Sequence, residues 1–420
     1  MSLALSEHRN LRFFILFLLY VAQGLPFGLF LAAVPAWLAQ GGASAAEIGA
    51  LQATVMLPWT LKLFYCFLAD RYAFLAMGRR RPWIIVSQFG IVAGLVAMAI
   101  ANPAAGQVSL VAAFAFAINI GSSMQDVAVD GLAVDILPAD EFARGNGYFY
   151  GGQVLGVSLA GGVGGYLIAY HSLPTALLAL AAVTAIILGA VMIVRERPGE
   201  RLLPWTRGIA VQRNLDLHLG AFVPIIRGVL TAMFQRQALL TLGAFFFAGA
   251  VSGLTVALGP IYSVQVLGWE KNVYSGWASQ SNLVAGILGL LLFGFIAERL
   301  GARRVFILSM VIMITLALAM LMLQPLWANG LILIGFIFVS RSLHTLRSVA
   351  SGTMGMTLCT PAIAASQFTL FMACINFGNM SAAASLGWLD RLGGIPAMFV
   401  AMAVCGLIAI GFAFAAKVGR

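Results

Sequence analysis

A chain of 420 residues with 61% hydrophobic and only 9% charged residues does not have the composition of a soluble domain, which carries roughly 25% charged residues. The mean hydropathy of +0.98 predicts an integral membrane protein. Long apolar runs favour helices of about 20 residues over the short alternating strands of a membrane barrel. The net charge of +10 does not indicate a nucleic-acid partner, because the basic residues lie in short segments between apolar runs.

The apolar runs predict an all-α membrane protein with twelve spans. The four cysteines have no paired spacing, so they predict neither a disulfide framework nor a metal site, and we expect no cofactor. One long polar stretch divides the spans into two sets of six, which suggests parallel repeats around a central cavity. We expect lobes at 1–194 and 237–420 and a cytoplasmic linker at 195–236 that carries an amphipathic helix. The expected spans are 11–38, 46–68, 82–101, 107–132, 145–170, 174–194, 238–266, 273–297, 304–324, 328–349, 364–388 and 394–416.

The distribution of Lys and Arg predicts the orientation of these spans. If both termini are cytoplasmic, the expected outer segments hold only Lys271 and Arg391, and most of the 24 basic residues fall on the inner side. Cytoplasmic loops are the ones enriched in Lys and Arg. We therefore expect a multi-pass protein with both ends inside.

A loop motif occurs once in each half of the chain. LADRYAFLAMGRRR follows the second span, and GFIAERLGARR follows the eighth. Each has an adjacent acid and arginine, a glycine and an arginine cluster, which resembles the loop motif of the major facilitator superfamily. An acid near a helix end can bind the positive end of a neighbouring helix and latch one face closed, although a plain topology anchor would look the same. The candidate gating residues are Asp70, Arg71, Arg79, Arg80, Glu298, Arg299 and Arg303.

Two carboxylates, Asp126 and Asp130, lie four residues apart in the fourth span and therefore on one helix face. Carboxylates at membrane depth are costly and usually serve a function. Because two adjacent acids cannot both carry charge cheaply, we expect one to hold a proton while Lys62 keeps the other ionised.

Basic residues occupy the equivalent tenth span. Arg341 and His344 share a face, and Arg347 near the inner end could simply snorkel. Arg341 could bind a carboxylate or phosphate, and His344 could carry protons. The alternative is that these charges are buried ion pairs that fasten helices. Asp135 and Arg144 are expected to form a structural pair in the inner loop after the fourth span. The proton-coupling candidates are Asp126, Asp130 and His344, and the substrate-binding candidates are Lys62, Arg341, Tyr20, Gln23, Gln125, Gln280 and Asn376.

Lys62 is followed by Asp70–Arg71–Tyr72 at the end of the second span, and Gln125–Asp126 and Asp130 are followed by Leu137–Pro138 at the end of the fourth. With these residues the chain resembles the AmpG muropeptide permease family of the major facilitator superfamily. The resemblance covers nearly the whole chain and extends to acetyl-coenzyme A transporters and siderophore importers. It implies a proton-driven importer of the bacterial inner membrane, working as a monomer.

The leading hypothesis is symport of protons with a bulky anionic solute such as an anhydro-muropeptide. A siderophore importer would have the same fold. A drug or metabolite exporter is disfavoured, because Val157 follows Gly156 where exporters carry a glycine and proline signature. An enzyme is disfavoured because no nucleophile and base set, metal cluster or phosphate loop is present in the sequence.

Overall fold

The structure is a computed structural model that describes residues 3–418. Within these residues it is helical and contains no β-strand, apart from an isolated bridge between Ala4 and Arg195. Eleven helices in the described part are long and apolar enough to cross a membrane. Pro361–Ala415 holds two of the expected spans, because its backbone leaves helical geometry at Gly393 and Gly394, where φ of Gly394 is 64°. The prediction of an all-α multi-span fold is therefore confirmed.

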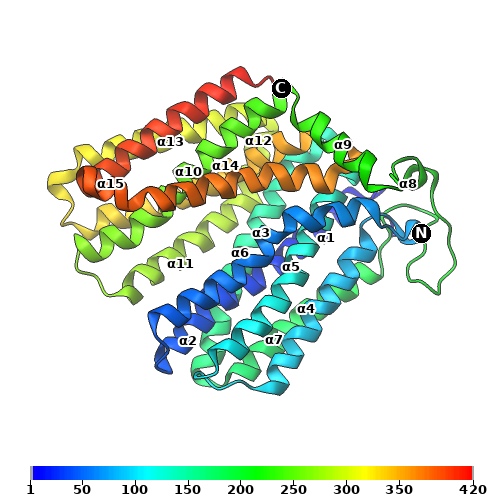
Figure 1. The fold of residues 1–420 in the computed structure, drawn as a ribbon, viewed down its shortest axis with the longest axis horizontal. Coiled ribbons are helices and arrows are strands. Elements are labelled where there is room, and N and C mark those ends of the chain that lie inside the picture. The colour runs from blue at the N-terminus through cyan, green and yellow to red at the C-terminus, as the bar shows by residue number, and fades with distance from the viewer. Residues whose placement is uncertain (1–2, 419–420) are drawn as a thin grey trace. The chain divides into compact units, whose positions relative to one another are not determined.

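The helices of Figure 1 follow the expected order, with some ends extended. The tenth expected span continues to Leu358, well past residue 349, and the fourth continues to Ile136. Two spans contain a π-helical turn, at Leu29–Ala33 and Gly289–Phe293. The α-helices are α1 Arg9–Gly28, α2 Val34–Gln40, α3 Ala45–Arg71, α4 Arg81–Ala101, α5 Val108–Ile136, α6 Phe142–Tyr170, α7 Leu173–Met192, α8 Gln212–Asp216, α9 Phe222–Met233, α10 Arg236–Gln265, α11 Lys271–Leu288, α12 Gly294–Leu300, α13 Ala302–Met322, α14 Gly330–Leu358 and α15 Ala364–Ala415.

The chain forms two compact units. Unit 1 contains Met1–Pro138, Gly152–Val229 and the short segment Thr360–Thr369, and unit 2 contains Ala139–Gly151, Leu230–Cys359 and Leu370–Arg420. In unit 1, α5 packs against α1, α3 and α4, and in unit 2, α14 packs against α10, α11 and α13. The fourth and tenth spans therefore have the same central place in their units.

The same arginine contact recurs in both units. In unit 1, Arg81 at the start of α4 donates to the carbonyls of Val191 and Met192 at the end of α7. In unit 2, Arg303 near the start of α13 donates to the carbonyls of Ala413 and Phe414 at the end of α15. Cations bind well at helix carboxyl ends, where carbonyls lack helical partners. The matching contacts support the internal repeat that the sequence indicates.

Glycines allow the backbone of α6 to lie in direct contact with the backbones of neighbouring helices. In unit 1, a Cβ atom on Gly24 of α1 would lie 2.2 Å from the carbonyl oxygen of Gln153 in α6. In unit 2, a Cβ atom on Gly151 would lie 2.6 Å from the backbone nitrogen of Leu290. Small residues at such positions are typical of tightly packed membrane helices.

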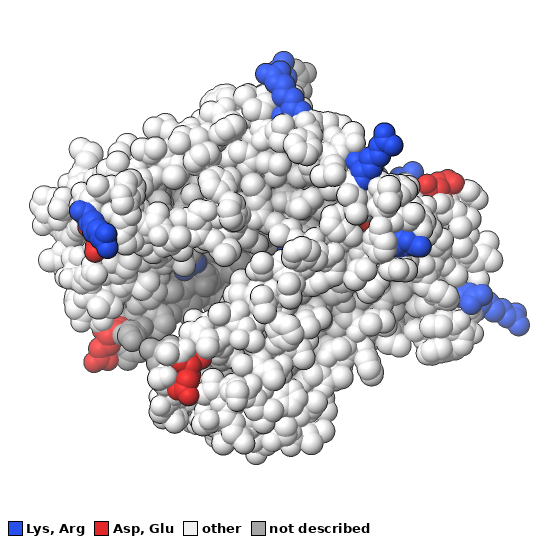
Figure 2. Space-filling model, viewed as in Figure 1, with Lys and Arg blue, Asp and Glu red and all other residues white. Residues whose placement is uncertain are grey.

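The surface agrees with a lipid-exposed protein. Figure 2 shows few charged side chains on the face in view, with broad areas that carry none. Large apolar side chains are exposed on many helices, among them Phe64, Ile186 and Leu291, each more than two-thirds exposed. A soluble monomer rarely exposes so much contiguous apolar surface.

The expected linker helix forms as α9, but its apolar residues lie on two sides. Ile225 and Val229 are buried in unit 1, whereas Val223 and Ile226 are 75% and 43% exposed. One side therefore packs on the protein and the other is free to contact a membrane surface.

Candidate functional site

The first candidate site is a buried charge cluster on α5 in unit 1. Lys62 of α3 donates to Oδ2 of Asp126 over 2.6 Å, and its ammonium lies 5.4 Å from the centre of the Trp59 ring. Lys62, Asp126 and Asp130 are exposed by only 4%, 6% and 2%. The structure thus brings together the three charges that the sequence predicts to act jointly.

Helix α1 supplies a neutral donor to each acid. Gln23 donates through its side-chain amide to Oδ1 of Asp126, and the Tyr20 hydroxyl donates to Oδ1 of Asp130. Pro26 lies in the next turn of the same helix. Tyr20 and Gln23, which the sequence predicts to contact substrate, are both bound to the carboxylates here, and their substrate contact stays a prediction. Gln125 donates to the carbonyl of Leu19 over 2.8 Å and is fully buried.

Charge counting shows what this cluster can do. Two carboxylates and one ammonium give a net charge of −1 when all three are ionised, and one added proton makes the cluster neutral. Charge buried away from water is costly unless it is compensated. The cluster can therefore take up and release a single proton between two states that differ in net charge.

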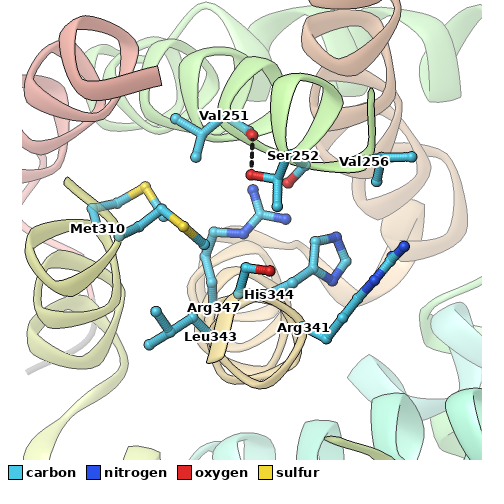
Figure 3. Close-up of a pocket in the computed structure, with 11 residues that line it drawn as sticks. Val251, Ser252, Val256, Met310, Arg341, Leu343, His344 and Arg347 are labelled. Atoms are coloured by element: carbon cyan, nitrogen blue, oxygen red, sulfur yellow. Dashed lines mark hydrogen bonds between the residues drawn. The ribbon is translucent and has the colours of Figure 1, made fainter. Parts of the chain in front are cut away.

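The second candidate site is a basic pocket in unit 2. Arg341, His344 and Arg347 project from α14 into a pocket whose other lining residues come mainly from α10 and α13 (Figure 3). Arg347 is 2% exposed and donates to the carbonyl of Ala248. It therefore does not snorkel to the surface, as its position near the expected inner end of the span suggested.

The remaining predicted polar contacts are not enclosed. The side chains of Gln280 on α11 and Asn376 on α15 are exposed, and neither forms a side-chain hydrogen bond within the described part of the chain. Their assignment as substrate contacts stays a prediction.

The gating candidates of unit 1 form a buried polar network. Asp70 accepts hydrogen bonds from Arg80 and from the backbone N–H of Ser366, the latter over 2.9 Å. Arg79 donates to the carbonyls of Pro361 and Ala362 over 3.0 and 2.9 Å. The loop after α3 is thus bound to the segment at the start of α15 that belongs to the same unit.

The equivalent loop of unit 2 is more exposed. Glu298 forms an ion pair of 2.6 Å with Arg144 of α6, and both side chains are 30% exposed. The predicted pairing of Asp135 with Arg144 is therefore wrong. Asp135 instead pairs with Arg197 over 2.9 Å, because the linker folds back over the end of α5.

The adjacent arginines of the two loop motifs do not pair with their neighbouring acids. Arg71 lies over the rings of Tyr72 and Phe222, and Arg299 lies 4.0 Å from the centre of the Phe295 ring. Side chains at i and i+1 of a helix point in different directions, so an acid and the residue after it cannot readily meet. The acids take partners from other segments.

Residues 16–383 match the family model described as Major Facilitator Superfamily. The chain belongs to this superfamily. It is 26% identical over 414 residues to an anhydromuropeptide permease of Escherichia coli, covering 94% of this chain and 78% of the relative. This similarity confirms the predicted resemblance.

Solved structures of the superfamily share the fold. The E. coli fucose:proton symporter FucP superposes with a TM-score of 0.72 at 14% identity, covering 97% of this chain and 98% of the symporter. The proton:xylose symporter XylE superposes with a TM-score of 0.67 at 13% identity, covering 98% and 97%. At such low identity the likeness establishes the fold alone. The chain is therefore a multi-pass membrane protein of a transporter superfamily.

In this superfamily member, Glu196 is a buried acid that its local sequence does not single out. Glu196 is fully buried just after α7, and its carboxylate accepts the backbone N–H groups of Arg79, Arg80 and Arg81 over 2.9, 2.7 and 2.5 Å. Gly78, with φ of 103°, leaves room for it, since a Cβ there would lie 2.4 Å from the carboxyl carbon. A carboxylate at a helix amino end is favourable, but nothing in the local sequence signals a partner more than a hundred residues away.

Proposed function

We propose that this protein is a proton-coupled symporter. It imports a bulky anionic solute, of the anhydro-muropeptide type, across the bacterial inner membrane by alternating access. It moves the cargo chemically unchanged, works as a monomer and has both termini in the cytoplasm. The coarser part of this description, membership of a transporter superfamily, rests on the family match over residues 16–383.

The observation that carries the proposal is the cluster of Asp126, Asp130 and Lys62. A buried set of two acids and one base can exist with or without one added proton, and the two forms differ in net charge. Asp126 is already matched by Lys62. We therefore assign the transported proton to Asp130, with Tyr20 as its hydrogen-bond partner in the unprotonated form.

The loop network supports an alternating-access cycle. The carbonyl and N–H contacts that Arg79 and Asp70 make with residues 361–366 would form and break together, because all depend on one loop after α3. Such a set of directional hydrogen bonds suits a latch with two discrete states. On the predicted orientation, this latch lies on the cytoplasmic side.

The choice of cargo rests on the relative named as an anhydromuropeptide permease, which matches across 94% of this chain. Peptide-bearing wall fragments carry carboxylates, and unit 2 offers arginines to bind them. A carboxylate siderophore would use the same chemistry, so it is included in the test.

The test is accumulation of labelled anhydro-muropeptide in proteoliposomes under an imposed proton gradient. We expect accumulation to collapse with an uncoupler, and Asp130→Asn to abolish gradient-driven accumulation while still exchanging cargo at equilibrium. Asp390→Asn is the matched control, because Asp390 is an exposed acid on α15. Undiminished accumulation by the Asp130→Asn protein would sink the coupling assignment, and uptake of ferric siderophores alone would move the cargo to iron chelates.

A further inference from the structure

Three basic side chains share one pocket in unit 2. Arg341, His344 and Arg347 occupy positions i, i+3 and i+6 of α14, and Figure 3 shows the His344 ring between the two guanidinium groups. Figure 3 also shows Arg347 and His344 directed toward α10. Val251 and Val256 of α10 and Met310 and Met313 of α13 form the apolar parts of the wall, and hydroxyl side chains such as that of Ser252 also line it. The pocket is built entirely from helices of one unit.

Among the described residues, none of these bases is paired with a carboxylate. No acid lines the pocket, and in the part of the chain that the structure describes none of the three forms an ion pair. Arg347 is 2% exposed and donates to the carbonyl of Ala248, which orients the guanidinium without cancelling its charge. A buried cation without a counter-charge is costly by several kcal/mol. The pocket therefore has strong reason to attract an anion.

The dimensions limit what that anion can be. The enclosed space of the pocket is about 10 Å³, roughly the room that one water molecule needs. It can therefore receive one oxygen of a carboxylate or phosphate group but not a whole ligand. Arginine binds such groups through two parallel N–H donors, and a neutral or charged imidazole can add a third donor. Where such contacts are buried, as at Arg347, the lower local dielectric constant strengthens them.

We infer that this pocket is an oxyanion-binding subsite, in which Arg341, His344 and Arg347 donate hydrogen bonds to one carboxylate or phosphate group whose oxygen enters the pocket. Resting on the proposed function, the inference identifies the anion as a charged end of the cargo, while the remainder of the cargo lies outside the pocket. The other source of the same chemistry is a phosphate group, either free or on a lipid.

The first arm of the test does not depend on the cargo. Thermal unfolding of purified protein in neutral detergent is followed while acetate, citrate or inorganic phosphate replaces chloride at constant ionic strength. We expect a saturable rise in melting temperature for the wild type and at least a tenfold weaker response for Arg341→Met. Arg341→Lys keeps the charge but not the planar fork and should respond at an intermediate level. Arg391→Met removes an exposed arginine elsewhere in unit 2 and should respond like the wild type.

The second arm identifies the source of the oxyanion. Binding of an anhydro-muramyl tripeptide is compared with that of its fully amidated, uncharged counterpart. We expect the acid form to bind at least tenfold more tightly to the wild type and the two forms to bind alike to Arg341→Met. Parallel unfolding in nanodiscs of phosphatidylglycerol or phosphatidylcholine shows whether a lipid phosphate occupies the pocket.

The outcomes separate the two proposals. Saturable stabilisation by small anions that depends on Arg341, without any muropeptide binding, supports the subsite and contradicts the proposed cargo. Muropeptide binding that ignores amidation and the Arg341→Met change overturns the subsite and leaves the transport proposal intact. A wild-type response to anions no larger than that of folded Arg341→Met also overturns the subsite.

Discussion

The central helices of the two units, α5 and α14, carry charges of opposite sign, and these charges have different kinds of partner. On α5, Asp126 and Asp130 are bound by an ammonium, an amide and a hydroxyl from neighbouring helices. On α14, the arginines and histidine line one pocket, and Arg347, the most buried of them, donates to the carbonyl of Ala248. The acids of α5 are matched by a cation within their own unit, which suits a proton site, whereas no acid is among the residues that line the basic pocket.

The largest difference in stability should appear when the removal of one cation from unit 1 is compared with the removal of one from unit 2. Lys62→Met leaves two buried acids without their counter-charge, so we expect a loss of about 3–5 kcal/mol in the free energy of unfolding. Arg341→Met removes a base without an acid partner and should cost less than about 1 kcal/mol in an anion-poor buffer. Denaturant or thermal unfolding of the purified variants measures both.

The double variant Lys62→Met with Asp126→Asn serves as the control for this pair. It should regain most of the stability lost in Lys62→Met, because the uncompensated charge is reduced. Equal losses in the free energy of unfolding for Lys62→Met and Arg341→Met would contradict the contrast between matched acids in unit 1 and unmatched bases in unit 2.

A second prediction concerns Glu200, a buried acid of unit 1 that lies close to Glu196 in the segment after α7, outside the predicted spans. Burial, followed by the nearby charge of Glu196, raises the pKa of Glu200 to about 7 from its ordinary value of 4.5. The folded protein then holds a proton over a range in which the unfolded chain has released it, so stability should fall as pH rises from about 4.5 to about 7. The drop should be at most about 3 kcal/mol.

Glu200→Gln should flatten this pH dependence. The glutamine oxygen can still accept the hydrogen bond from the Asn214 amide. The glutamine has an NH₂ group in place of the second carboxylate oxygen, so the hydrogen bond from the backbone N–H of Arg197 is lost. Melting temperatures measured from pH 4.5 to 8 for both proteins check the prediction. An unchanged slope in the variant would assign the pH dependence to other groups.

A third prediction concerns the neutral donor to Asp130. Tyr20→Phe removes one hydrogen bond to a buried carboxylate and keeps the ring, so we expect a loss of about 2 kcal/mol. The same change should alter the pH dependence of transport more than its maximal rate, since it removes the partner of the unprotonated acid. Tyr166→Phe is the matched control, because Tyr166 is 57% exposed.

The smallest effect is expected at the exposed ion pair of unit 2. Glu298→Gln should lower stability by less than about 1 kcal/mol, because the pair with Arg144 is 30% exposed on both sides and is screened by salt. Its effect on transport should exceed its effect on stability if the pair serves gating. Stability measured at low and high salt, together with uptake rates, separates the two contributions.

Much of this arrangement can be predicted from sequence because membrane helices leave strong local signals. Apolar length located the spans, and the four-residue spacing of Asp126 and Asp130 placed both acids on one face of α5. Partner choice could not be predicted as well. Pairings such as Asp135 with Arg197 join residues far apart in the chain, and several residues could have met each acid. The role of Arg347 depended on whether α14 continued past residue 349, which apolar length alone does not decide.

The hydrogen bond from Ser366 to Asp70 has a consequence for the order of synthesis. The two residues are 296 positions apart, so at roughly 5–20 residues per second the ribosome needs on the order of tens of seconds to make the donor after the acceptor. Arg80 follows Asp70 within a second or two and can hold it meanwhile. The first helices can therefore enter the bilayer early, but the hydrogen bonds of Asp70 are complete only after the eleventh span has been made. We therefore expect a chain truncated before Ser366 to leave Asp70, near its beginning, without one of its donors.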